Sequence, residues 1–142
     1  MGERLALDVP ISHDLAFMRD LVHCFAMEAG MTEHRAGLLV MAVNEIVTNV
    51  LEHAGGTGTL RACGDERGVT VHVTDDAGTL TTEHLQRVPG PVATRGMGLW
   101  LVRQVCDEVW LDHPGGRTHL RLSMFFEDPA TSSADRLSDE LR

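Results

Sequence analysis

The chain has 142 residues, of which 43% are hydrophobic and 23% charged, and its formal net charge is −9. This length suits one domain that is large enough to bury a hydrophobic core. The acidic balance disfavours a nucleic-acid surface, which needs clustered cations. All 12 basic residues are Arg, and the lack of Lys excludes a Walker P-loop, the common protein-kinase fold and Schiff-base chemistry.

Signals for membranes or export are also lacking. No apolar run approaches the roughly 20 residues of a membrane-spanning helix, and "MGERLALDVPISHD" has neither the basic start nor the apolar stretch of a signal peptide. The three cysteines are odd in number and far apart. They suit a reducing compartment and argue against a disulfide framework or a CxxC metal site. We therefore expect a cytoplasmic protein with neither a membrane nor a nucleic-acid partner.

The first half of the chain predicts one strand and two helices. Large apolar side chains occupy every second position, which is strand periodicity: Leu5, Leu7, Val9 and Ile11. Ser12 is expected to cap a helix that stops at Gly30, because these residue types favour such positions. Thr32 is the expected cap of a second helix over residues 33–53.

The second half predicts four strands and one helix. Two strands near residues 59–64 and 69–74 are joined by the turn "DERG". A long irregular connection with two prolines leads to a helix over about 99–107, and a last hairpin pairs "EVWLD" with "THLRLSMFF". From Glu127 the chain is acidic, Ser-rich and poor in apolar residues, which is typical of a frayed tail.

This order of elements predicts an α+β two-layer sandwich, with a mixed, mostly antiparallel sheet covered by helices on one face. We expect a single domain over residues 1–126 and an acidic, disordered tail over 127–142. Cys24 and Cys106 fall on apolar helix faces, so we expect both thiols in the core.

Polar residues interrupt the second predicted helix within "MAVNEIVTNVLEHAGG", Met41 to Gly56. Glu45 and Asn49 are four residues apart and therefore share one face of the helix. A carboxylate beside an amide oxygen is a ligand set that suits Mg²⁺, and a carboxylate there can act as a general base. The alternative is that both side chains are simply exposed to solvent.

A glycine turn, "RGMG", precedes the third predicted helix. Gly96 and Gly98 allow close backbone approach, and the helix behind them offers free N–H groups and the positive end of its dipole. This arrangement can bind phosphate without Lys, and Arg95 can add a charged fork. Taken alone, the same residues could also form an ordinary turn.

These segments together resemble the GHKL (histidine-kinase-like) ATPase superfamily. "NEIVTN" resembles its N-box, "VTVHVTDDAG" sits where its adenine-binding Asp box belongs, and "RGMGLWLVRQVCDEV" resembles its second glycine box. "PGGRTHLRLSM" is similar to its closing hairpin, so the resemblance covers roughly residues 5–126. Within the superfamily the chain most resembles the bacterial anti-sigma-factor serine kinases, which implies a Bergerat-type ATP-binding fold.

The resemblance implies a role for each site residue. Glu45 would be catalytic and take the proton of the substrate serine, Asn49 would hold Mg²⁺, and Asp75 would read the adenine amino group, with Asp76 as its fallback. The implied cofactors are ATP and Mg²⁺, and residues 79–95 would form a lid over the phosphates. The nucleotide would be bound by Asn49, Asp75, Asp76, Gly78, Arg95, Gly96, Met97, Gly98 and Leu99.

The implied function is an ATP-binding anti-sigma factor that phosphorylates an anti-anti-sigma partner and sequesters a sigma factor, in a family whose members commonly form homodimers. A second hypothesis is a binding module with weak or no nucleotide binding, because Ala77 and Thr79 stand where the Asp box has glycines when it is read from Asp75. A third, the ATPase unit of a sensor kinase, is disfavoured because these 142 residues contain no sensor or phosphoacceptor region.

Overall fold

The computed structural model describes residues 5–53, 57–76 and 97–127. Its elements are β1 (Leu5–Pro10), α1 (Leu15–Ala29), α2 (Glu33–His53), β2 (Gly58–Gly64), β3 (Gly68–Asp75), α4 (Met97–Val105), β4 (Glu108–Asp112), a 3₁₀ turn (Pro114–Gly116) and β5 (Thr118–Phe125). The strands form one sheet in the order β1-β2-β3-β5-β4. None of the described helices has the length and apolar character that crossing a membrane requires.

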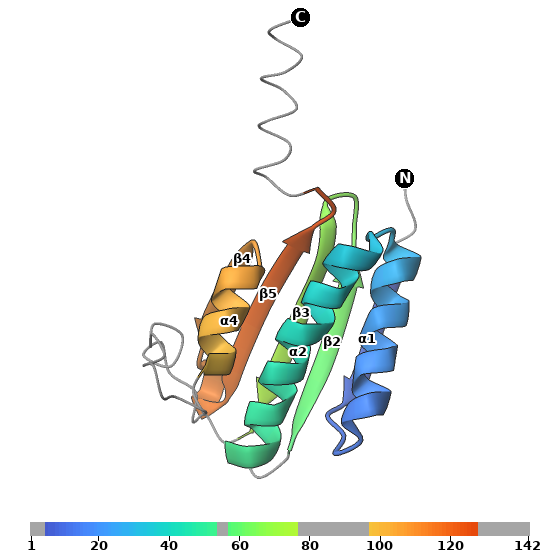
Figure 1. The fold of residues 1–142 in the computed structure, drawn as a ribbon. Coiled ribbons are helices and arrows are strands. Elements are labelled where there is room, and N and C mark those ends of the chain that lie inside the picture. Colours follow the sequence, from blue (N-terminus) through green and yellow to red (C-terminus); the bar gives the residue numbers. More distant parts are fainter. Residues whose placement is uncertain (1–4, 54–56, 77–96, 128–142) are drawn as a thin grey trace, which may run out of the picture.

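The helices α1, α2 and α4 lie on one face of the sheet (Figure 1). All four pairs of neighbouring strands are antiparallel. The predicted two-layer α+β sandwich is therefore confirmed. The division of the chain at residue 126 stays a prediction, since residues 128–142 lie outside the described part.

The ends of α1 correct one sequence prediction. Asp14, not Ser12, caps the helix, because its Oδ1 accepts a hydrogen bond from the backbone N–H of Phe17 at 3.0 Å. The Ser12 hydroxyl instead accepts from the backbone N–H of Asp14 at 3.0 Å, which holds the chain in the turn before the helix. Gly30 ends the helix as predicted, in a left-handed conformation with φ of 111° that favours glycine.

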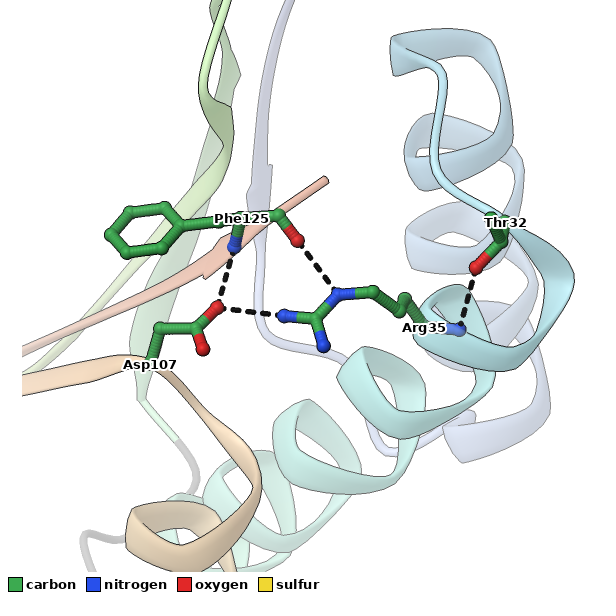
Figure 2. A network of polar contacts seen from close by, with 4 residues as sticks. All are labelled: Thr32, Arg35, Asp107 and Phe125. Atoms are coloured by element: carbon green, nitrogen blue, oxygen red, sulfur yellow. Dashed lines mark hydrogen bonds and ion pairs between the residues drawn. The ribbon is translucent and has the colours of Figure 1, made fainter. Parts of the chain in front are cut away.

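A buried ion pair fixes the start of α2 to the far end of the chain (Figure 2). Thr32 caps the helix as predicted, because its hydroxyl accepts from the backbone N–H of Arg35 at 3.2 Å. The Arg35 guanidinium donates to Asp107 Oδ2 and to the Phe125 carbonyl, both at 2.7 Å. The backbone N–H of Phe125 donates to the same Asp107 oxygen at 2.7 Å. One cluster therefore joins α2, the residues after α4 and the end of β5.

The core lies between the helices and the sheet. Alternate residues of β3 and β5 point into it, as strand geometry requires, and their neighbours face away from the helices. Cys106 is buried in this core as predicted, but the prediction for Cys24 is wrong: this thiol is exposed on α1. The largest fully buried side chains are Val22, Leu39, Ile46, Val47, Val50, Leu60, Val69, Val71, Val102, Leu120, Leu122 and Met124.

Candidate nucleotide site

The polar row of α2 is half-buried. The side-chain N–H of Asn49 donates to the backbone carbonyl of Glu45 at 2.8 Å. Because the nitrogen of this amide is engaged by its own helix, its oxygen is the atom left to face a ligand. Asn44, on the same helix, differs because its amide oxygen already accepts from the Arg19 guanidinium at 3.3 Å. Asn49 is therefore the better placed of the two to offer an amide oxygen.

The end of β3 separates its two aspartates. Asp75 lies on the same, helix-facing side of β3 as Val71 and Val73, and it is 1% exposed. Asp76 is exposed, and its carboxylate lies 3.7 Å from the Arg117 guanidinium. The register that the alternation of the strand predicts thus places Asp75, rather than Asp76, on the side of the helices.

The C-terminal part of α2 lies over this end of the sheet. Gly58 pairs with Asp75 across β2 and β3. A Cβ atom added to Gly58 would lie 3.3 Å from Val50 Cγ1 and 2.6 Å from the carbonyl oxygen of Thr74. Asn49 immediately precedes Val50, so the amide and the buried carboxylate of Asp75 belong to the same end of the domain.

Thr118 is a candidate site residue that the sequence analysis did not predict. It opens β5 and is the register partner of Asp75 across β3 and β5. Its side chain is 1% exposed, and its hydroxyl has no hydrogen-bond partner among the residues that the structure describes. Buried hydroxyls in native proteins are normally paired, so this one stands out. The sequence does contain a signal for this residue. The alternation of β5 places Thr118 on the same buried side of the strand as Leu120 and Leu122, although Thr118 is polar.

The helix α4 points its N-terminal end toward the same region. Asp107, just after the C-terminal end of α4, is bound to Arg35 near the start of α2, so the two helices run in opposite directions. Figure 1 shows the first turn of α4 and the last turns of α2 at the same end of the sheet. The helix begins at Met97, two residues before the predicted start, and Leu99 is buried against the core. Gly78, Arg95 and Gly96 lie outside the described residues.

Two kinds of chemistry meet at this end of the domain. Asp75 and Thr118 offer a buried carboxylate and a buried hydroxyl side by side, which suits a flat polar base. Glu45 and Asn49 offer hard oxygen atoms of the kind that Mg²⁺ prefers. Within the described ranges no group of three His, Cys, Asp or Glu side chains is arranged to hold a metal. A cation here would therefore need oxygen ligands from a bound phosphate or from water.

Two solved structures share this fold. The first contains the RsbU and RsbW domains of Rv1364c from Mycobacterium tuberculosis, with a TM-score of 0.61 and 17% identity over 90% of this chain and 34% of that one. The present chain thus spans about a third of that protein's length. The second is the SiaB-SiaC complex from Pseudomonas aeruginosa, with a TM-score of 0.56 and 16% identity over 85% of this chain and 89% of that one.

Sequence comparison gives the family. A search of curated proteins finds no match. A family model described as the histidine kinase-like ATPase domain matches residues 12–124, which is most of the chain. The chain therefore belongs to the histidine kinase-like ATPase domain family, as the sequence boxes predicted, and membership of this family of ATPase domains implies nucleotide binding.

Proposed function

We propose that this chain binds Mg-ATP at the common end of α2, β3 and β5 and phosphorylates a serine of an anti-anti-sigma protein. In this proposal it also sequesters a sigma factor, which the unphosphorylated partner releases. Family membership supports the nucleotide part. The fold shared with an RsbW domain and with the SiaB-SiaC complex agrees with a regulator that works through protein partners.

The observation that carries the proposal is the buried Thr118 hydroxyl beside Asp75. A buried polar atom without a partner costs about 1–3 kcal/mol, and a ligand that supplies the missing hydrogen bond removes that cost. In the proposal the Asp75 carboxylate accepts a hydrogen bond from the adenine amino group. The Thr118 hydroxyl completes the polar edge of the same pocket, so the two residues together select the base.

The polar residues of α2 would bind the metal ion in the proposed site. The Asn49 amide oxygen is the ligand that this chain would offer to Mg²⁺, an ion that usually takes few protein ligands together with phosphate oxygens and water. Bound Mg²⁺ supplies charge neutralisation for the transferred phosphoryl group. The N-terminal end of α4 adds backbone N–H groups and the positive end of its dipole, which hold phosphate oxygens without Lys.

Glu45 has the remaining chemical role in the proposal. Its carboxylate lies on the same face of α2 as Asn49, one turn away. It would accept the proton of the substrate serine as the serine oxygen bonds to the γ-phosphorus of ATP and the bond from that phosphorus to the leaving ADP breaks. Asn49 keeps the phosphates oriented, and the residues of the site otherwise contribute position and charge, as in phosphoryl transfer generally. We place this reaction in the cytoplasm, where the three free cysteines stay reduced.

A second candidate function rests on the Asp box. Ala77 and Thr79 occupy positions where glycine would let the backbone approach the base closely. Their side chains would crowd this approach and weaken nucleotide binding. The alternative is therefore a regulatory module that acts through protein contact alone. The orphaned Thr118 hydroxyl argues for the nucleotide site, because a pure binding module gains nothing from it.

Calorimetric titration separates the two functions. The native protein is titrated with ATP and with ADP, each with and without Mg²⁺, alongside Asn49→Ala and the matched control Asn44→Ala. Binding that depends on Mg²⁺, is lost in Asn49→Ala and persists in Asn44→Ala supports the site. No heat from the native protein at millimolar nucleotide would leave the binding module as the function.

A further inference from the structure

The face of the sheet that points away from the helices contains a polar hollow. Figure 1 shows the described helices gathered on the opposite face. The hollow measures about 360 Å³ and lies over β2, β3, β5 and the edge of β4, with Arg67 from the β2–β3 turn at its rim. It lies on the other side of the sheet from the inward row of Val71, Val73 and Asp75. It is therefore separate from the candidate nucleotide site.

Two arginines line the hollow, and each guanidinium lies over an aromatic ring. The Arg67 guanidinium lies 4.6 Å from the centre of the Phe125 ring, and that of Arg121 lies 4.9 Å from the centre of the Trp110 ring. Neither makes an ion pair with any residue in the described ranges. A cation–π contact uses none of the guanidinium N–H donors, which are the groups that bind oxyanions.

Hydroxyl groups lie between the two arginines. Thr70 and Ser123 face each other across β3 and β5, with their oxygens 3.1 Å apart. This pair lies between the row of Phe125, on which Arg67 stacks, and the row of Arg121. The hollow thus has charged donors at two sides and small hydroxyl donors along its floor.

The two acidic residues of the hollow, Asp65 and Glu108, make no ion pair with these arginines in the described ranges. Asp65 uses one carboxylate oxygen to accept the backbone N–H groups of Arg67 and Gly68, at 2.8 and 3.1 Å, which closes the turn. Glu108 makes no ion pair within the described part of the chain. The pKa of His72, also in the lining, is lowered by burial and then by the positive charges of its neighbours, Arg121 among them.

We propose that this hollow binds an oxyanion group, either a carboxylate or a phosphate, through the guanidinium groups of Arg67 and Arg121. The N–H edge of a guanidinium that makes no ion pair matches the planar geometry of a carboxylate and the oxygens of a phosphate. The chain as a whole carries a net charge of −9, which repels anions. The attraction for an anion must therefore come from the charges inside the hollow. It does not depend on nucleotide binding, so it stands or falls separately from the function proposed above.

The chain contains its own probe for the test. Cys63 lines the hollow and is exposed, whereas Cys24 is exposed on α1 in the helical layer. The full chain, without nucleotide, is treated at low salt with iodoacetate or with neutral iodoacetamide, and the modification rate of each cysteine is followed by mass spectrometry. In both reactions a thiolate displaces iodide and forms a sulfur–carbon bond. The ratio of the two rates at one cysteine cancels the intrinsic reactivity of that thiol.

We expect the iodoacetate-to-iodoacetamide ratio at Cys63 to exceed that at Cys24 by about fivefold, which is what a partly exposed charge pair supplies. Inorganic phosphate and succinate serve as competitors, and the one that protects Cys63 at lower concentration identifies the preferred oxyanion. Equal ratios at Cys63 and Cys24 would overturn the proposal. So would a Cys63 ratio that neither competitor reduces.

Three exposed arginines provide matched variants. Arg67→Gln and Arg121→Gln each remove a proposed ligand, and each is expected to bring the Cys63 ratio down toward the Cys24 value. Arg61→Gln removes the same charge from the same face of the sheet, two residues from Cys63 but outside the lining, and is expected to keep most of the preference. An equal loss in all three variants would mean that the preference for iodoacetate comes from the overall positive charge on this face of the sheet and not from a local binding site. That result would contradict the proposal.

Discussion

Arg35 and Asp107 are 72 residues apart in sequence, yet their side chains form a 2.7 Å ion pair in which both are nearly buried, at 11% and 13% exposure. The pair fixes the residues after α4 to the start of α2. With the C-terminal end of α4 beside the start of α2, the N-terminal end of α4 lies at the end of the domain where Asn49 and Asp75 are found. This contact therefore lies at the end of the helices opposite to the candidate site.

Replacement of Arg35 tests the strength of this contact. Arg35→Met leaves the Asp107 carboxylate buried without its cation, and we expect the free energy of unfolding to fall by about 3 kcal/mol or more. Arg61→Met is the control, because Arg61 pairs with Asp8 at 3.8 Å with both side chains more than half exposed. We expect it to change stability by less than about 1 kcal/mol. Urea denaturation of both variants measures the two values, and similar losses would contradict the assignment of Arg35 as the structural partner.

Local chemistry explains what the sequence predicted well. Gly30 and Thr32 mark a helix end and a helix start through their own backbone and side-chain preferences, and the strand alternation places Asp75 inward. The cap of α1 was misassigned because Ser12 and Asp14 are both good caps, and only the path of the chain out of β1 selects Asp14. Cys24 was misplaced for a similar reason, since an apolar stretch on a helix does not show which side the sheet covers.

Contacts between distant segments could not be predicted in this way. Thr118 matters because the register of β3 and β5 sets it opposite Asp75, and no local pattern gives that register. The Arg35–Asp107 pair and the stacking of Arg67 on Phe125 likewise depend on tertiary packing. Family resemblance supplied the nucleotide hypothesis, but the orphaned hydroxyl that supports it is visible only in three dimensions.

Thr118→Val should change stability and nucleotide affinity in opposite directions. Valine has nearly the same shape, so the variant removes a buried hydroxyl without a described partner and is expected to raise the free energy of unfolding by about 1 kcal/mol. The same change removes one hydrogen bond to the proposed ligand, and ATP affinity should fall about fivefold. Thermal unfolding and calorimetry measure the two effects.

A matched threonine controls for the loss of a hydroxyl. Thr70 lies on the other face of the sheet, and its hydroxyl is already paired with Ser123. Thr70→Val should therefore lower stability slightly and leave ATP affinity unchanged. If Thr118→Val instead destabilised the protein, its hydroxyl would have a partner in the folded chain and would not be reserved for a ligand.

Two glycines should respond to alanine with opposite signs. Gly37 is exposed within α2, and an added Cβ meets nothing within 4 Å, so Gly37→Ala should stabilise the protein by about 0.5–1 kcal/mol through helix propensity. A Cβ on Gly68 would lie only 2.1 Å from the carbonyl oxygen of Met124 on the paired strand. Gly68→Ala must displace that backbone and should cost about 1–3 kcal/mol. Urea midpoints measure both, and a neutral Gly68→Ala would show that the β3–β5 pair is looser than the structure indicates.

The pH dependence of stability should reveal the buried thiol of Cys106. Burial, and then the negative charge of Asp107, raise the pKa of this thiol from 9.0 to about 12, while the charge of Arg35 acts in the opposite sense. The unfolded chain therefore loses a proton near pH 9 that the folded chain retains. The contribution of the thiol is fully present below pH 9 and is lost as the pH rises toward 12, with a slope of at most about 1.4 kcal/mol per pH unit.

Two measurements check this prediction for Cys106. At pH 8 a neutral disulfide reagent should modify the exposed Cys24 and Cys63 quickly and should reach Cys106 only after unfolding, because thiolate is the reactive form and little of it exists at the buried site. Urea denaturation between pH 8 and pH 10.5 should show a loss of stability that is smaller in Cys106→Ala than in the native protein. Cys24→Ser should keep the full loss, because this variant leaves the buried thiol of Cys106 in place. Equal pH slopes in the native protein and Cys106→Ala would mean that other groups, and not this thiol, govern the alkaline limb.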